Sequence, residues 1–119
     1  MNIMIVDDHA DMRRMLRNLV CVFKGASTRV TECETGEQAV AQYELLKPDC
    51  VLMDIELGTM SGFEATKKIN QLDSAANVVI VTSHDNHIFR TKSEELKVKG
   101  YVTKDKLFDL ALILHTINS

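Results

Sequence analysis

The chain has 119 residues, of which 45% are hydrophobic and 26% are charged, a size and balance that suit one compact domain with a single core. Its net charge of -3 and pI near 5.8 give no basic footprint, so we do not expect this segment to bind nucleic acid directly. The sequence has no apolar run long enough to span a membrane and no charged and apolar leader, and we therefore expect a cytoplasmic protein without membrane attachment.

Short β-type runs alternate with helical patterns along the chain. In chain order the β-type runs are residues 3–6, 29–33, 50–53, 77–81 and 100–103, of which 29–33 is the least apolar. Helical spacing of apolar residues follows each run, over residues 12–23, from a capping box at 35–38 to the residue before Pro48, from a second capping box at 61–64, over 86–98 and over 106–117. Residues 86–98 have few apolar anchors, which predicts marginal packing there. The alternation is typical of a parallel sheet with helices on both faces.

Chemically useful side chains follow four of the five β-type runs. Asp7 and Asp8 come after the first run, Asp54 after the third, Thr82 after the fourth and Lys104 after the fifth. In an open α/β sheet, ligands bind at the carboxyl ends of the strands, near the point where the strand order reverses. We therefore expect the acids, the hydroxyl and the lysine to meet at one edge of the sheet.

With these residues in this order, the sequence resembles the receiver domain of two-component response regulators over its whole length. The resemblance implies a flavodoxin-like, doubly wound (βα)5 fold in which a five-stranded parallel sheet has the order 2-1-3-4-5 and residues 1–119 form a single receiver domain. Residues 6–9, together with Asp105 directly after Lys104, resemble receivers joined to LuxR-type helix-turn-helix outputs, although no such output is present in these residues. The chain is then either a stand-alone receiver or the N-terminal domain of a longer transcription regulator.

The three carboxylates favour a divalent cation. Carboxylates brought close together repel one another unless a cation offsets the repulsion, and oxygen ligands suit Mg²⁺, which keeps several waters and uses one or two carboxylates with phosphoryl oxygens. The resemblance implies that Asp8 and Asp54 bind Mg²⁺ directly, and that Mn²⁺ can substitute. It also implies that Asp7 acts largely through water and that the backbone carbonyl of Glu56 is a further ligand.

The resemblance further assigns roles in phosphotransfer. Asp54 is the expected phosphoacceptor, because a carboxylate is a competent nucleophile toward phosphorus, and the donor is a phosphohistidine on a sensor histidine kinase or histidine phosphotransfer protein. Lys104 stabilises charge on the phosphoryl oxygens. Thr82 then binds a phosphoryl oxygen and Tyr101 rotates inward, so that the surface of the fourth helix, fifth strand and fifth helix changes. We expect a switch that controls an output domain or partner protein and autodephosphorylates, and not a turnover enzyme.

The resemblance also singles out two positions beside the site, which vary among receivers and tune the access of water to the phosphoaspartate. Glu56 lies two residues after Asp54, and His84 lies two residues after Thr82. We hypothesise that Glu56 and His84 flank the in-line path of the hydrolytic water and so set the lifetime of the phosphorylated state. The other histidines lack partners at ligand spacing, and solvated or helix-end roles are expected for them.

The remaining signals concern thiols and surface. Cys21, Cys33 and Cys50 are odd in number, lack metal-type spacing and lie in or beside apolar segments, which predicts free, buried thiols. Apolar residues beyond the inner stripe of the last helix, including Leu112 and Ile113, allow a phosphorylation-dependent homodimer or another partner surface. Ordinary incomplete burial is the alternative.

Each functional interpretation has a simpler rival. An aspartate at a strand end can cap the next helix, Thr82 can be a turn hydroxyl, and Tyr101 can keep one rotamer permanently. At the level of function, the chain can be a pseudo-receiver that binds partners without phosphorylation. A haloacid-dehalogenase-type phosphatase needs a second aspartate where Glu56 stands, and a Rossmann domain needs a glycine-rich turn where residues 8–11 read Asp-His-Ala-Asp.

Overall fold

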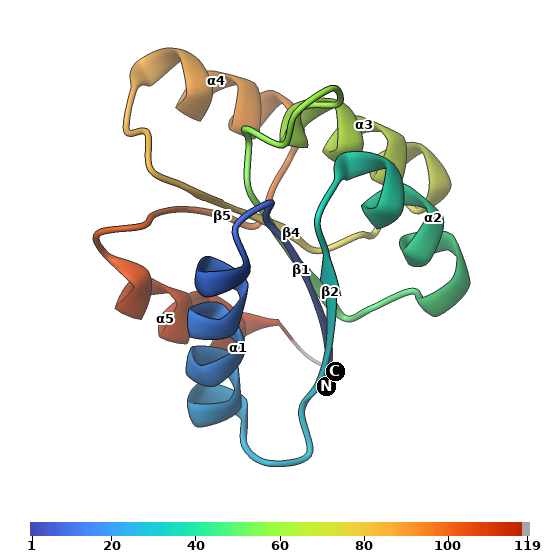
Figure 1. Cartoon of the computed structure of the whole chain (residues 1–119). Coiled ribbons are helices and arrows are strands. Elements are labelled where there is room, and N and C mark those ends of the chain that lie inside the picture. Colours follow the sequence, from blue (N-terminus) through green and yellow to red (C-terminus); the bar gives the residue numbers. More distant parts are fainter. Residues whose placement is uncertain (118–119) are drawn as a thin grey trace.

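The computed structural model describes residues 1–117, which form a parallel sheet with helices on both faces (Figure 1). The elements in chain order are β1 (Asn2–Val6), α1 (Ala10–Lys24), β2 (Arg29–Cys33), α2 (Gly36–Leu46), β3 (Cys50–Met53), α3 (Gly62–Leu72), β4 (Val78–Thr82), α4 (His87–Glu95), β5 (Gly100–Thr103), the 3₁₀ turn η1 (Leu107–Asp109) and α5 (Leu110–Thr116). All strand pairs are parallel, in the order β2-β1-β3-β4-β5. The predicted fold and strand order are confirmed.

Two apolar layers hold the helices to the sheet. On one face Met4 and Val6 of β1 pack with residues of α2 and α3, while on the other face Ile3 and Ile5 pack with residues of α1 and α5. Figure 1 shows the same division, with α1 and α5 together on one side and α2, α3 and α4 on the other. Because side chains alternate along a strand, consecutive apolar residues of β1 serve both layers, which is why the run is uninterrupted.

Side-chain caps begin three of the helices. The hydroxyl of Thr35 accepts a hydrogen bond from the backbone N–H of Gln38 at the start of α2, and Ser61 accepts one from Glu64 at the start of α3, as the capping-box patterns predicted. Asn86 caps α4 in the same way by accepting from Phe89. These caps satisfy backbone donors that have no partner within the first turn of a helix.

The second half of the chain departs from the predicted boundaries. The helix expected over 86–98 ends at Glu95, and the chain then turns through Lys97, whose φ of 59° lies in the left-handed region that favours glycine. The helix expected over 106–117 begins as the 3₁₀ turn η1 and becomes α-helical only at Leu110. Within the described residues, Ser93 is the one buried residue of α4, which agrees with the marginal packing expected there.

The cysteines are free thiols, as predicted, and Cys33 and Cys50 are buried; Cys21 is only half-buried, so the expected burial is wrong for that residue. Burial raises the pKa of Cys33 to about 11 and that of Cys50 to about 12, so both are protonated and unreactive at neutral pH.

The last helix exposes one of the two apolar residues that the sequence suggested for a partner surface. Leu112 is exposed, whereas Ile113 packs against the core beside α1 and α5. None of the helices in residues 1–117 combines the length and apolar character needed to cross a bilayer.

Candidate functional site

The strand register brings the predicted site residues to one edge of the sheet. Val6 lies beside Met53, and Met53 beside Ile80, so β1 and β3 end level with one another while β4 continues two residues further, to Thr82. Backbone bonds continue the ladder beyond the strands, since Asp54 N–H donates to Val6 at 2.9 Å and Lys104 N–H donates to Thr82 at 2.8 Å. The side chains that follow these strands are therefore placed by the sheet itself rather than by flexible loops.

Lys104 joins the two buried carboxylates of the site. Its Nζ lies 2.9 Å from Oδ2 of Asp7 and 3.5 Å from Oδ2 of Asp54. Asp7 is 1% exposed and Asp54 is 6% exposed, so both acids are removed from bulk water. Ionised carboxylates are costly to bury without a partner, and the ammonium group of Lys104 supplies one partner for two acids.

The electrostatics of Asp54 reflect this shortage of positive charge. Burial raises the pKa of Asp54 to about 6; Lys104 opposes that increase, and the neighbouring charge of Asp7 adds to it. The Oδ1 atom accepts a hydrogen bond from the backbone N–H of Ile55 at 2.9 Å, which favours the ionised form. Burial alone would lower the pKa of Lys104, but its hydrogen bond to Asp7 and the charge of Asp54 raise it. Lys104 is therefore a permanent cation, and Asp54 is the acid whose charge a further cation would stabilise.

The acidic pair after β1 lies against a histidine that the sequence pattern did not single out. Ligand atoms of Asp7, Asp8 and His9 all lie within 4.8 Å of one another, and His9 Nδ1 is 2.9 Å from Oδ1 of Asp8. His9 is also the N-cap residue of α1, in keeping with the helix-end role expected for it. Its position directly after two aspartates was the available signal that it would contact them.

The donor set at this edge fits a hard divalent cation. Asp7, Asp8 and Asp54 offer carboxylate oxygens, which are the ligands that Mg²⁺ prefers. Asp7 has little capacity left, because Oδ1 accepts the backbone N–H of His9 at 2.8 Å and Oδ2 faces Lys104. Asp8 is exposed and Asp54 is only partly neutralised, so these two acids are the better placed to bind a cation directly.

A second group of predicted residues forms a connected chain beside the acids. Thr82 is buried, and its Oγ1 accepts a hydrogen bond from the backbone N–H of His84 at 3.2 Å. The ring of His84 is in hydrogen-bonding contact with the Glu56 carboxylate, which joins the loop after β3 to the loop after β4. The hydroxyl of Tyr101 donates to the backbone carbonyl of His84, and the guanidinium of Arg90 lies 4.5 Å from the Tyr101 ring centroid. His84 thus contacts Thr82, Glu56 and Tyr101.

Arg13 contacts the site, although the sequence analysis did not identify it as a site residue. Its side chain is 11% exposed, and Nη1 donates to the backbone carbonyl of Asp7 at 2.8 Å. Arg13 lies on the buried face of α1 with Leu16 and Val20, so a charged residue interrupts the inner stripe of an amphipathic helix. That interruption is a signal in the sequence, since a buried charge requires a partner.

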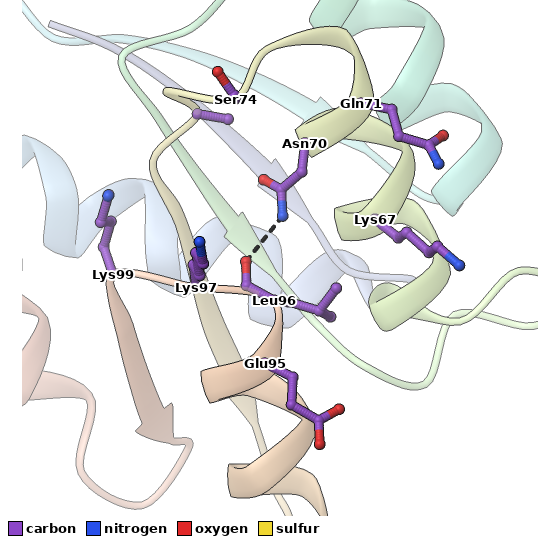
Figure 2. Close-up of a pocket in the computed structure, with 9 residues that line it drawn as sticks. Lys67, Asn70, Gln71, Ser74, Glu95, Leu96, Lys97 and Lys99 are labelled. Atoms are coloured by element: carbon purple, nitrogen blue, oxygen red, sulfur yellow. Dashed lines mark hydrogen bonds between the residues drawn. The ribbon is translucent and has the colours of Figure 1, made fainter.

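The site is distinct from the hollow between α3 and α4. That hollow has a volume of about 390 Å³ and is lined by residues that include Lys67, Asn70, Leu96 and Lys97 (Figure 2). Asn70 bridges the two helices by donating to the Leu96 carbonyl at 2.9 Å. Ala76 and Lys99 also line it and precede β4 and β5, so the hollow opens at the opposite end of the strands from Asp54.

Comparisons with known proteins converge on one family. The family model described as "Response regulator receiver domain" matches residues 3–118. The transcriptional regulatory protein YdfI of Bacillus subtilis (strain 168) is 32% identical over 117 residues, which cover 98% of this chain and 53% of that protein. Chemotaxis protein CheY of the same organism is 33% identical over 116 residues, covering 98% of this chain and 93% of that protein.

A solved structure agrees with these sequence matches. The two-component response regulator of the LuxR family from Aurantimonas sp. SI85-9A1 superposes with a TM-score of 0.83 and 34% identity, covering 96% of this chain and 85% of that chain. The chain thus spans about half of one curated relative, YdfI, and nearly all of another, CheY.

Proposed function

Because the chain belongs to the response regulator receiver domain family of two-component systems, we propose that it is a phosphoacceptor switch that is modified on Asp54. Members of the family are signalling domains, and we take residues 1–119 as one such domain. The observation that carries the proposal is the position of Asp54, which is buried at the end of β3 with Lys104 Nζ at 3.5 Å and Asp7 across the same lysine. An acceptor carboxylate beside a fixed cation supports transfer of an anionic phosphoryl group.

In the proposed step a carboxylate oxygen of Asp54 attacks the phosphorus of a phosphohistidine. The new O–P bond gives an aspartyl phosphate, the N–P bond breaks, and its electron pair returns to the imidazole of the donor. Lys104 stabilises the phosphoryl oxygens, since its Nζ already faces the Oδ2 side of Asp54. The donor is proposed to be a sensor histidine kinase or a histidine phosphotransfer protein.

Asp8, Asp54 and the backbone carbonyl of Glu56 are proposed to hold Mg²⁺, with Mn²⁺ as a substitute. When bound, the ion would neutralise charge on the acids and on the phosphoryl group. Asp7 is proposed to act through water, and its two oxygens, already engaged by His9 and Lys104, support that role.

The switch is proposed to run from Thr82 to Tyr101. The Thr82 hydroxyl accepts from His84, and its own proton has no acceptor among the described residues, so it is available to a phosphoryl oxygen. Because Tyr101 donates to the carbonyl of the same His84, movement of the loop after β4 displaces the partner of the tyrosine. The readout surface would then be α4, β5 and α5.

Glu56 and His84 are proposed to control the lifetime of the aspartyl phosphate. Their side chains are in contact across the two loops that border Asp54. Hydrolysis needs a water in line with the bond to phosphorus, and we propose that this pair restricts its approach. Autodephosphorylation is therefore proposed to be slow while the pair is intact.

The output of the switch is proposed from the relatives of the chain and from its exposed apolar residues. The relatives include a protein named as a transcriptional regulator and one named as a chemotaxis protein, and we propose that phosphorylation in the cytoplasm controls an output domain or a partner protein. Phe108 and Leu112 are exposed large apolar side chains near the C-terminus and would suit a phosphorylation-dependent homodimer.

Intact mass measurement tests the central proposal. The chain is incubated with Mg²⁺ and acetyl phosphate, alongside Asp54→Asn, an EDTA control, and Asp49→Asn as a variant of an acid remote from the site. Gain of one acid-labile phosphoryl group by the parent and by Asp49→Asn alone supports the proposal. No gain in a folded parent with any donor identifies a pseudo-receiver and overturns it.

A further inference from the structure

Arg13 is a buried cation that touches the backbone of the acidic turn. Its Nη1 donates to the Asp7 carbonyl at 2.8 Å, and its Nε donates to Oε1 of Glu32 at 2.9 Å. Its Nη2 also lies 3.7 Å from the Glu34 carboxylate. The planar guanidinium thus links α1 to the end of β1 and to β2 in fixed directions, which a flexible ammonium group would not do as well.

Glu32 is itself held in place by a second arginine. Arg17 donates to Oε2 of Glu32 from Nε at 3.0 Å and from Nη2 at 2.7 Å. The hydrogen bond from Arg17, together with that from Arg13, lowers the pKa of Glu32 against the opposing effect of burial. Glu32 therefore stays ionised, and the anchor of Arg13 on β2 is fixed in position.

The Asp7 backbone is held on both sides by this arrangement. Its N–H donates to the Cys33 carbonyl of β2 at 3.1 Å, and its C=O accepts from Arg13. Asp8 follows directly and is exposed, and its Oδ1 lies 2.9 Å from Nδ1 of His9. The direction in which Asp8 leaves the strand is thus set by the peptide that Arg13 holds.

We propose that Arg13 is a positioning residue for the divalent-cation site, acting through the Asp7 peptide to orient Asp7 and Asp8 without touching the ion or the phosphoryl group. This inference rests on the proposed function. Residues that orient metal ligands from behind typically contribute 10- to 100-fold to metal affinity. A guanidinium acting only as a nearby charge would do the opposite, because its repulsion of a cation would disappear on substitution.

Calorimetric titration with MgCl₂ separates these two roles. The parent chain is compared with Arg13→Gln, which removes the charge, and Arg13→Lys, which keeps it but loses the planar fork. Arg17→Gln is the matched control, because Arg17 binds the same Glu32 and does not contact Asp7. Circular dichroism and thermal unfolding establish that each variant is folded at the titration temperature.

The proposal expects both Arg13 variants to bind Mg²⁺ about tenfold more weakly, while Arg17→Gln remains close to the parent. A second variant, Glu32→Gln, which weakens the anchor from β2, should fall between them. Parent-like binding in folded Arg13→Gln and Arg13→Lys, or tighter binding in Arg13→Gln, would overturn the inference and leave the proposed function intact. A parent chain that neither bound Mg²⁺ nor accepted a phosphoryl group would remove the proposed function and this inference together.

Discussion

The hydroxyl of Tyr101 donates a hydrogen bond to the backbone carbonyl of His84 across 2.6 Å, although the two residues lie on different sides of α4 in the sequence. The N–H of the same His84 donates to Thr82, and its ring contacts Glu56. One residue of the loop after β4, His84, therefore contacts Thr82, Glu56 and Tyr101 at the same time. Any displacement of this loop changes all three contacts together.

Tyr101 should report phosphorylation by its fluorescence. The chain has two tyrosines and no tryptophan, so Tyr43→Phe leaves Tyr101 as the intrinsic emitter. Acetyl phosphate should change the emission or acrylamide quenching of this variant, because movement of Thr82 displaces the carbonyl that Tyr101 binds. In Tyr43→Phe with Thr82→Ala the change should be lost while phosphorylation of Asp54, followed by mass, persists. An undiminished change in the double variant would show that Thr82 does not transmit the signal.

Phosphorylation should slow as the pH falls through about 6. Burial raises the pKa of Asp54 to about 6, and a protonated carboxylic acid is a poor nucleophile. The initial rate with acetyl phosphate, measured at low Mg²⁺ between pH 5 and pH 8, should follow the ionised fraction of Asp54. Saturating Mg²⁺ should move the midpoint downward because the cation favours the ionised form. A rate independent of pH over this range would contradict the assignment.

Asp54→Asn should stabilise the fold at neutral pH. The pKa of Asp54 is higher in the folded chain than in the unfolded chain, so between the two values the folded state binds more protons and the free energy of unfolding falls as pH rises. The cost is absent below the unfolded pKa and complete above about 6, and it amounts to roughly 3 kcal/mol. In urea unfolding, the variant should have a higher free energy of unfolding than the parent at pH 7.5 and the same free energy of unfolding near pH 4. If the variant and the parent had equal free energies of unfolding at both pH values, burial would not destabilise the ionised form of Asp54.

Lys104→Met should move the pH midpoint of phosphorylation upward. The charge of Lys104 lowers the pKa of Asp54, so its removal leaves burial and Asp7 unopposed. Breaking a buried ion pair from one side also costs about 3–5 kcal/mol of stability, and the free energy of unfolding should fall at neutral pH. Lys106→Met, which changes an exposed lysine nearby, is the matched control. A slower rate at an unchanged midpoint would assign Lys104 to the phosphoryl oxygens alone.

Removing the Glu56 and His84 side chains should shorten the life of the aspartyl phosphate. The two side chains bridge the loops beside Asp54, so alanine at both positions opens an approach for water. The half-life of the purified phosphorylated chain, followed by intact mass, should fall in Glu56→Ala and His84→Ala, and the double variant should show whether the two act as one unit. An unchanged half-life in the double variant would rule out the gating role.

The sheet and the acid edge were readable from sequence because their signals are local. An apolar run followed by a polar residue identifies a strand and its end, and parallel order then places Asp7, Asp54 and Lys104 together. The Arg13 contact with Glu32 depends on residues 19 positions apart, for which a single sequence offers only an interrupted apolar stripe. The early end of α4 was hidden for a different reason, since a lysine rather than a glycine occupies the left-handed position.

Helix α4 is secured to the sheet by very little. Ser93 is its one buried residue among those described, and the hydroxyl of that serine bonds to the Phe89 carbonyl of the same helix rather than to the core. Segments held by few apolar contacts open in local fluctuations at a small fraction of the global unfolding free energy. Amide protons of residues 87–95 should therefore exchange with solvent long before those of β1 and β3. Helix α4, which is part of the proposed readout surface, can therefore be displaced by the small free energy that a single phosphoryl group supplies.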